Sequence, residues 1–155
     1  MGNAASAATV SASALLATEL VGSVFTIGLN RPAKRNALND DIMEEIQHCF
    51  THLPEGIGAV VLHGIGAHFS AGLDLSELRE RDATEGLRHS QMWHRVFDKI
   101  QYCRVPVIAA LKGAVIGGGL ELACATHIRV AEPSTYFALP EGQRGIFVGG
   151  GGSVR

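Results

Sequence analysis

Three consecutive glycines lie inside the stretch Lys112-Gly113-Ala114-Val115-Ile116-Gly117-Gly118-Gly119-Leu120-Glu121-Leu122-Ala123. The apolar run before it, 107–111, predicts a buried strand, and the pattern after the glycines predicts a helix over about 120–125. The first N–H groups of a helix are unpaired and carry the positive end of its dipole, and glycine allows a ligand to approach them closely. The stretch therefore predicts a strand-to-helix junction suited to an anion or a developing oxyanion.

A second glycine-bearing junction, His68-Phe69-Ser70-Ala71-Gly72-Leu73-Asp74-Leu75, follows the apolar run at 59–62. Two such junctions that face one point would supply two backbone N–H donors to the same oxygen atom. Glycine triplets also allow a helix to pack closely on a sheet, and this simpler explanation stays open for the triplet at 117–119. We expect Asp74 to cap or brace its loop rather than to take part in chemistry.

Apolar runs and helical patterns alternate along the chain. The predicted strands are 24–29, 59–62, 107–111 and 128–131, and the predicted helices are about 41–51, 84–102 and 120–125. This alternation is typical of an α/β fold with right-handed crossovers and a largely parallel sheet. In such sheets, ligands bind where strand ends meet helix starts.

The two longer predicted helices each have an apolar face. Asn39 and Asp40 are candidate N-caps for the first helix, in which Ile42, Ile46 and Phe50 share one side. The apolar stripe of the second helix consists of Leu87, Met92, Trp93, Val96, Phe97 and Ile100. We expect these faces to pack against the sheet.

The composition is that of one globular domain. The chain has 155 residues, of which 46% are hydrophobic and 18% charged, and its mean hydropathy is +0.18. These values exclude a disordered chain. A net charge of −2 and a pI near 6.4 give no electrostatic reason to expect a nucleic-acid partner. Glycine is abundant, with 19 residues, and its clusters hold most of the functional signal.

Residues 1–18 are rich in Ala and Ser and lack the basic start and apolar centre of a secretory signal. We expect them to form a flexible lead-in to a domain at 19–155. Residues 1–6 also fit the short N-myristoylation pattern. No apolar run approaches the ~18 residues of a membrane-spanning helix, so we expect no membrane partner.

Two glutamates are candidates for acid and base chemistry. Glu121 lies three residues beyond Gly118, so its carboxylate could lie beside the same N–H donors. It could also simply stabilise the helix start, a contribution of about 0.3–1 kcal/mol. Glu141 follows the last predicted strand, and its ordinary role would be a solvated loop charge. Two carboxylates near one electrophile could share acid and base work if burial or pairing separates their pKa values.

Other common sites find no support in the sequence. The chain lacks a G-x-x-x-x-G-K-[ST] loop, a G-x-G-x-x-G after its first strand and a C-x-x-C pair. Ser70 lies in no G-x-S-x-G elbow. The seven histidines are scattered, so we expect surface or core positions and no metal site. Small core residues in a reducing compartment are expected at Cys49, Cys103 and Cys124.

Five ordered motifs resemble the enoyl-CoA hydratase/isomerase (crotonase) family and occur at that family's spacing. They are the segments 30–38, 69–74, 106–110, 117–123 and 140–141. The similarity extends over residues 24–155, which is nearly the whole chain. Five motifs in the right order are far more specific than any one of them.

The resemblance implies a crotonase-like (ClpP/crotonase) spiral of ββα units and a coenzyme A thioester as the substrate, with no separate cofactor and no metal. The backbone N–H groups of Leu73 and Gly118 match the two positions that form the oxyanion hole for the thioester oxygen. Glu121 and Glu141 match the two glutamates that position and split water. The chemistry common to the family is an enolate stabilised in that hole.

The same resemblance implies a site for the rest of coenzyme A. Lys34 and Arg35 match positions that contact the CoA phosphates, a role suited to flexible cations. The carbonyl of Ala71 matches the contact to adenine. Because both glutamates are present, the resemblance favours hydration of a 2-enoyl-CoA, or the reverse dehydration. Double-bond isomerisation, thioester hydrolysis and a non-catalytic CoA-binding or interaction form stay open as alternatives.

The resemblance also implies structure beyond the glycine run at 149–152. In the family this run leads into another core helix and a C-terminal helical region, which helps to cover the acyl pocket and to build a homotrimer or hexamer. We expect this chain to be the N-terminal part of such a fold, truncated before that region. The acyl specificity depends on the same region and on residues near 84–95. The implied compartment is the cytoplasm, or the mitochondrion or peroxisome in a eukaryote.

Overall fold

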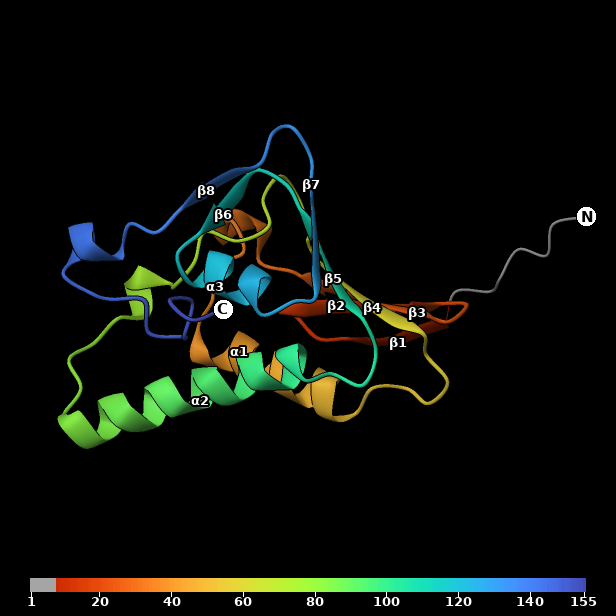
Figure 1. Ribbon diagram of the computed structural model, residues 1–155, viewed down its shortest axis with the longest axis horizontal. Coiled ribbons are helices and arrows are strands. Elements are labelled where there is room, and N and C mark those ends of the chain that lie inside the picture. Colours follow the sequence, from red (N-terminus) through yellow and green to blue (C-terminus); the bar gives the residue numbers. More distant parts are fainter. Residues whose placement is uncertain (1–7) are drawn as a thin grey trace, which may run out of the picture.

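The computed structural model describes residues 8–155 and contains a six-stranded sheet (Figure 1). Its strands, in order across the sheet, are β1 Ala8–Ala12, β2 Leu16–Val21, β3 Val24–Leu29, β4 Ala59–Gly64, β5 Val107–Leu111 and β7 Ile128–Ala131. The neighbours from β3 to β7 are parallel, whereas β1, β2 and β3 pair antiparallel. The predicted α/β fold with a largely parallel sheet is confirmed, with an antiparallel edge added.

Over residues 8–18, the antiparallel edge replaces the flexible lead-in that was expected at residues 1–18, of which residues 1–7 lie outside the described part. Strands β1 and β2 form a hairpin there, and β2 continues in register onto β3. Backbone pairing, together with the buried side chains of Leu16 and Thr18 in β2, builds this edge. An Ala- and Ser-rich segment carries too little alternation to reveal it. The myristoylation pattern at residues 1–6 lies outside the described residues.

Three helices connect the strands, and their bounds are α1 Asp40–Thr51, α2 Ala83–Gln101 and α3 Gly118–Cys124. Each lies within about two residues of its predicted range. Asn39 caps α1 as predicted, because its side chain accepts a hydrogen bond from the Ile42 N–H at 3.2 Å. Asp82 and Glu85 form a capping box at the start of α2. Figure 1 shows α1 and α2 lying side by side along the sheet.

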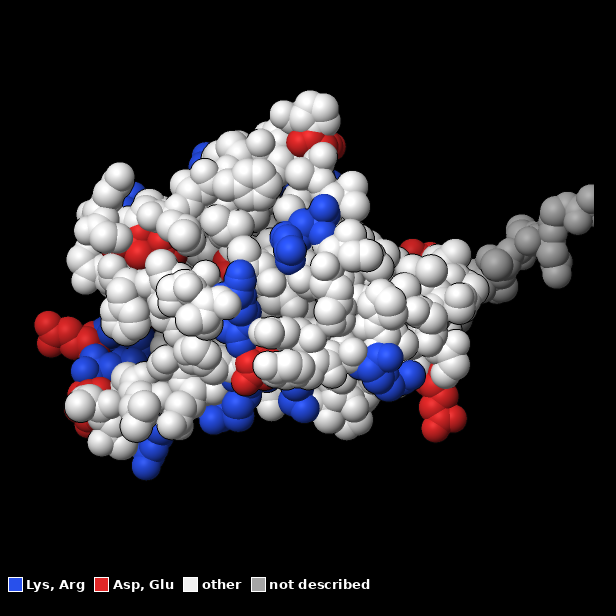
Figure 2. Space-filling view, viewed as in Figure 1, with Lys and Arg blue, Asp and Glu red and all other residues white. Residues whose placement is uncertain are grey.

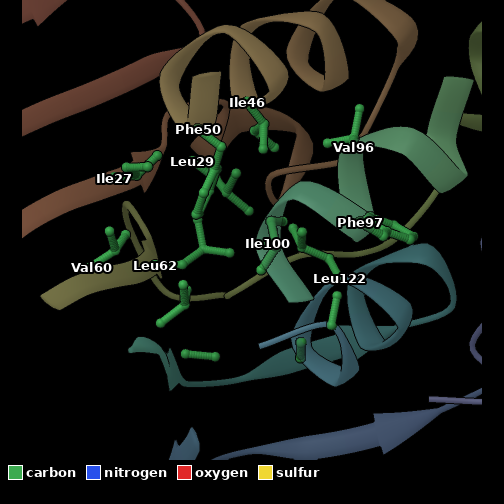
Figure 3. Close-up of a cluster of buried hydrophobic side chains, with 14 of the residues drawn as sticks. Ile27, Leu29, Ile46, Phe50, Val60, Leu62, Val96, Phe97, Ile100 and Leu122 are labelled. Carbon is green, nitrogen blue, oxygen red and sulfur yellow. The ribbon is translucent and has the colours of Figure 1, made fainter. Parts of the chain in front are cut away.

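The hydrophobic core lies between the sheet and these two helices (Figure 3). Its labelled side chains are Ile27, Leu29, Val60 and Leu62 of the strands, Ile46, Phe50, Val96, Phe97 and Ile100 of α1 and α2, and Leu122 of α3. The predicted apolar faces are therefore confirmed, with one exception. Leu87 is 59% exposed, because the first turns of α2 extend beyond the sheet.

A second, two-stranded sheet positions the glycine triplet. Strand β6 Ala114–Ile116 pairs in parallel with β8 Tyr136–Ala138, and α3 begins two residues after β6 ends. Strands of three residues carry too few side chains for a period-two pattern, so the sequence did not predict them. The short 3₁₀ helices are η1 Pro32–Lys34, η2 Leu75–Glu77 and η3 Glu141–Arg144.

Charged side chains are dispersed over the surface. Figure 2 shows acidic and basic groups interspersed on one face, with uncharged surface between them. In the part of the chain from residue 8 onward, no helix is both long and apolar enough to cross a membrane. The three cysteines are half-buried free thiols, so the expectation of core residues holds only in part. Burial, and then the charge of Glu45, raise the pKa of the Cys49 thiol.

Candidate active site

The two glycine junctions lie against each other. Ser70 and Val115 form a β-bridge between them, and the Ile116 N–H donates to the Ser70 carbonyl at 3.0 Å. A Cβ on Gly72 would lie 2.5 Å from the Ile116 carbonyl oxygen, and Gly72 has a φ of +84°. Glycine is therefore required at this position for both its small size and its backbone conformation.

The N–H groups of Leu73 and Gly118 meet at this contact. The Leu73 nitrogen lies 3.7 Å from the position that a Cβ of Gly118 would occupy. The neighbouring N–H groups of Gly72 and Asp74 donate to the chain itself. Those of Leu73 and Gly118 find no acceptor among the residues that the structure describes. Two unpaired donors on these adjoining segments are candidates for binding one oxygen atom.

The glycine triplet fits both explanations offered for it. A Cβ on Gly119 would lie 2.7 Å from the Ser70 Cβ, so Gly119 allows α3 to pack closely against the first junction. Gly117 has a φ of +53°, and a Cβ there would approach Glu141 Oε1 to 2.8 Å. Close packing thus accounts for Gly119, whereas Gly118 borders an open cavity.

Glu121 projects from the first turn of α3 and is only 4% exposed. Its Oε1 accepts hydrogen bonds from the N–H groups of Gly150 at 2.8 Å and Gly152 at 3.0 Å. Burial raises the pKa of the Glu121 carboxyl above its ordinary value, and the charge of Glu141 adds to that rise. The two amide donors and His94 act in the opposite direction. A buried carboxylate held in this way can hold or release a proton.

Glu141 begins the 3₁₀ helix η3 and is 7% exposed, so the alternative of an ordinary solvated loop charge is wrong. Its Oε1 faces Gly117. Its Oε2 is buried and has no hydrogen-bond partner within residues 8–155. Such an orphaned acceptor is costly unless another group supplies a hydrogen. Glu141 is therefore arranged to bind a donor that the described chain does not supply.

One cavity of about 360 Å³ brings these groups together. Its lining includes Leu73, Gly118, Glu121 and Glu141, all of which the sequence had singled out. The remaining wall is largely apolar and comes from the loop before α2, from α2 itself and from residues 145–150. A small number of polar groups converging in an apolar cavity is typical of a small-molecule site.

Trp93 and His89 of α2 also line this cavity. Both lie in the range 84–95 that the resemblance connected with acyl specificity, but the sequence did not single out either residue as part of the site. The Trp93 indole N–H donates to Asp40 Oδ1 at 3.2 Å, and His89 Nε2 lies 2.8 Å from the same oxygen. The Trp93 ring comes within 3.2 Å of the position of a Gly118 Cβ. Trp93 belongs to the apolar stripe of its helix, so periodicity alone could not separate a cavity wall from core packing.

The residues expected to contact coenzyme A lie apart from the glutamates. None of Lys34, Arg35 and Ala71 lines the cavity. The Ala71 N–H donates to the Arg35 carbonyl at 2.9 Å, so these two residues are neighbours. Lys34 Nζ donates to Asp74 Oδ2 at 2.8 Å and to Ser76 at 3.0 Å, so a phosphate would have to compete for this cation.

Asp74 braces its loop, as the sequence predicted. It caps η2 by accepting a hydrogen bond from the Ser76 N–H, and its Oδ2 contacts Arg31 at 2.9 Å as well as Lys34. Burial by itself raises the pKa of the Asp74 carboxyl, but hydrogen bonds from Lys34, Ser76 and Arg31 hold it well below its ordinary value. The described residues contain no group of three or more His, Cys, Asp or Glu arranged to hold a metal.

Known proteins match this chain in sequence and in fold. The sequence profile described as enoyl-CoA hydratase/isomerase matches residues 19–155. The short-chain-enoyl-CoA hydratase of Clostridium acetobutylicum is 36% identical over 140 residues, which are 88% of this chain and 54% of that protein. The chain therefore spans about half the length of the curated relatives it matches.

Solved structures extend the comparison. A protein of Rhodopseudomonas palustris CGA009, provisionally named an enoyl-CoA hydratase, is 76% identical, with a TM-score of 0.91 over 96% of this chain and 57% of its own. A protein of Thermobifida fusca YX with the same provisional name was solved in complex with acetoacetyl-CoA. It is 26% identical, with a TM-score of 0.80 over 91% of this chain and 60% of its own.

Proposed function

This chain belongs to the enoyl-CoA hydratase/isomerase family and has the crotonase fold, and on that premise we propose that it holds the active site of a 2-enoyl-CoA hydratase. The reaction adds water across the 2,3 double bond of a coenzyme A thioester, or removes it in reverse. The observation that carries the proposal is the single cavity shared by two unpaired N–H groups and two buried carboxylates, Glu121 and Glu141.

The N–H groups of Leu73 and Gly118 hold the thioester oxygen. When a nucleophile adds to the β-carbon, the electrons of the double bond move toward the carbonyl and negative charge develops on this oxygen. Preformed donors stabilise that charge more strongly than the neutral ground state, and each typically contributes about 2.7–4 kcal/mol to the transition state. The missing side chain of Gly118 supports this role, because a Cβ there would lie 3.2 Å from the Trp93 ring and would narrow the approach to the N–H group.

Glu121 and Glu141 divide the proton transfers of the reaction. One carboxylate binds the water and accepts its proton while the oxygen bonds to the β-carbon. The other group begins the step as a carboxylic acid and gives its proton to the α-carbon, which restores the carbonyl, so that one glutamate ends protonated and the other ionised. The unpartnered Oε2 of Glu141 supports this division, because it is free to accept a hydrogen bond from the water. The raised pKa of Glu121 supports it, because that carboxyl holds a proton more strongly than an ordinary glutamate.

The rest of the thioester lies outside this cavity. We propose that Lys34 and Arg35 bind the CoA phosphates and that the Ala71 carbonyl accepts a hydrogen bond from adenine. Coenzyme A enters as part of the substrate, and neither a metal nor a separate cofactor takes part. The complex of the Thermobifida fusca protein with acetoacetyl-CoA supports an acyl-CoA ligand. We propose a homotrimer or hexamer as the assembly of the whole protein.

Replacement of each glutamate tests the proposal. Glu121→Gln and Glu141→Gln preserve side-chain size but cannot exchange protons, so each is expected to lower the hydration rate about 10²- to 10⁴-fold. The measurement is the loss of conjugated-enoyl absorbance from a short 2-enoyl-CoA. Glu80→Gln is the matched control, because Glu80 is exposed and does not line the cavity.

Hydration that continues at the full rate in both cavity variants would show that these carboxylates do not carry the reaction. Product analysis separates the related reactions within the family. A shifted double bond would identify an isomerase, and free CoA would identify a thioester hydrolase. Binding of the thioester with no turnover by this chain would favour a form that only binds CoA.

A further inference from the structure

Arg155 contacts two separate parts of the fold, one of which includes Gly150 of the cavity lining. Its guanidinium donates to the carbonyl of Gly150 at 2.6 Å and to Gln101 Oε1 at 2.7 Å, and it pairs with Asp98. The guanidinium also lies 5.7 Å from the centre of the Phe97 ring. The side chain is only 6% exposed, so this cation is almost completely enclosed by its partners.

These contacts join helix α2 to a glycine turn, which we define as residues 149–152. Gln101, Asp98 and Phe97 belong to α2, whereas the Gly150 carbonyl belongs to the turn. The same turn donates two N–H groups to Glu121 Oε1. A continuous series of contacts thus runs from α2 through Arg155 and the glycine turn to the Glu121 carboxylate.

The glycine turn has little stiffness of its own. Glycine has the largest backbone freedom to lose on ordering, and Gly151 has a φ of +86°. A Cβ on Gly150 would lie 2.4 Å from a Phe97 ring carbon, and one on Gly152 would lie 2.6 Å from Glu121 Cγ. The close fit excludes larger side chains that would restrict the turn, so its conformation depends on contacts from outside.

We propose that Arg155 is a positioning residue for Glu121, fixing the glycine turn so that the Gly150 and Gly152 N–H groups remain directed at Oε1. The inference rests on the proposed function only in assigning Glu121 a part in the chemistry. A guanidinium suits this task because it is planar and presents several donors at fixed angles to acceptors on different elements. A lysine at this position would keep the charge but not that geometry.

The proposal predicts a change in the acidity of Glu121. The charged groups that face its carboxyl are Glu141, which raises its pKa, and His94, which lowers it. The two amide donors also lower it. Without Arg155 the turn loosens and these donors are withdrawn, so the pKa of Glu121 rises further while Glu141 and His94 remain in place.

The test compares Arg155→Gln and Arg155→Lys with wild type by a carboxyl carbon NMR titration of Glu121 in this chain. Both variants are expected to raise the Glu121 pKa and to weaken the coupled pH response of the Gly150 and Gly152 amide protons. Arg104→Gln is the matched control, because Arg104 is exposed, does not line the active-site cavity and its loss changes the charge by the same amount. In the hydration assay, the Arg155 variants should lower kcat about 10- to 100-fold with a smaller change in KM.

A titration in Arg155→Gln that matches wild type would overturn the proposal, and so would complete recovery in Arg155→Lys, which would point to charge alone. If Arg155→Gln fails to fold, Gln101→Ala removes one contact and should shift the titration in the same direction by less. The two proposals fail separately. A shifted titration without hydration would contradict only the proposed reaction, whereas a Glu121-dependent reaction with an unchanged titration would contradict only the positioning role.

Discussion

Two buried acidic regions of this molecule balance their charge in different ways. Asp74 is surrounded by partners from its own chain, because Arg31 and Lys34 both contact one of its oxygens. Glu121 and Glu141 form no ion pair with any Lys or Arg of residues 8–155. Glu121 has two amide donors, and Glu141 keeps an unpartnered oxygen.

The difference distinguishes a structural carboxylate, Asp74, from the two carboxylates for which we propose a part in the reaction. The Asp74 region is electrostatically complete, so its carboxylate stays ionised and holds the loop that carries Leu73. The Glu121 and Glu141 region leaves both acceptors and donors open to one cavity. A carboxylate without a counter-ion in a buried site exchanges protons more readily, which is the property that acid and base chemistry needs.

The largest effect on stability should come from disrupting the ion pairs of Asp74. Asp74→Asn removes the charge from the Arg31 and Lys34 contacts while preserving the size of the side chain. Asp74 is buried but Lys34 is 47% exposed, so we expect a loss of about 2 kcal/mol in the free energy of unfolding, between the values for exposed and buried pairs. Denaturant unfolding at neutral pH measures it.

Glu77→Gln is the control for that variant, because Glu77 is 47% exposed and lies 3.4 Å from Arg31. Its cost should stay below about 0.5 kcal/mol. The Asp74 pKa is lowered in the folded chain, so its stabilisation exists above the ordinary value of 3.8 and disappears as the pH falls further. Equal costs for Asp74→Asn and Glu77→Gln would contradict the distinction between the two regions.

A smaller effect of opposite sign is expected at Glu121. Its pKa is raised in the folded chain, so its contribution to stability is present below the ordinary value of 4.5 and is lost as the pH rises through the folded value. The stability of Glu121→Gln relative to wild type should therefore increase as the pH rises. At neutral pH we expect its Tm to be higher by about 2–4 °C, which corresponds to ~1 kcal/mol in a domain of this size.

Thermal unfolding of both proteins between pH 4 and pH 8 measures this pH-dependent difference in Tm. Glu80→Gln changes the charge by the same amount on the surface and should follow wild type throughout. If Glu121→Gln instead loses stability relative to wild type as the pH rises, the Glu121 carboxylate is a stabilising ion and the contrast with Asp74 fails.

Much of the fold could be predicted because its elements carry local patterns. The apolar face of α1, the run that forms β5 and the Asn39 cap are all encoded within a few neighbouring residues. Strands β1, β2, β6 and β8 were not predicted, because they depend on pairing with other strands more than on a local pattern. The sequence predicted both glycine junctions, but it could not establish that they lie against each other in the fold.

The candidate site shows the same limit in its side chains. Glu121 was identifiable because it lies one helical turn beyond a glycine junction. The burial of Glu141, the place of Trp93 in the cavity wall and the contacts of Arg155 all depend on segments far apart in the sequence. No local pattern distinguishes a buried loop glutamate from a solvated one, so the structure was needed to separate them.

The most direct test measures the amide resonances of Leu73 and Gly118, whose N–H groups are unpaired beside Glu121 and Glu141. Acetoacetyl-CoA is added to the isotopically labelled chain, and the amide resonances are recorded by NMR. The proposed oxyanion hole predicts that the Leu73 and Gly118 amide protons move downfield and saturate together, while the amide of exposed Gly142 stays unchanged. Binding that leaves the Leu73 and Gly118 amides unmoved, or no binding at all, would contradict an active site at this junction.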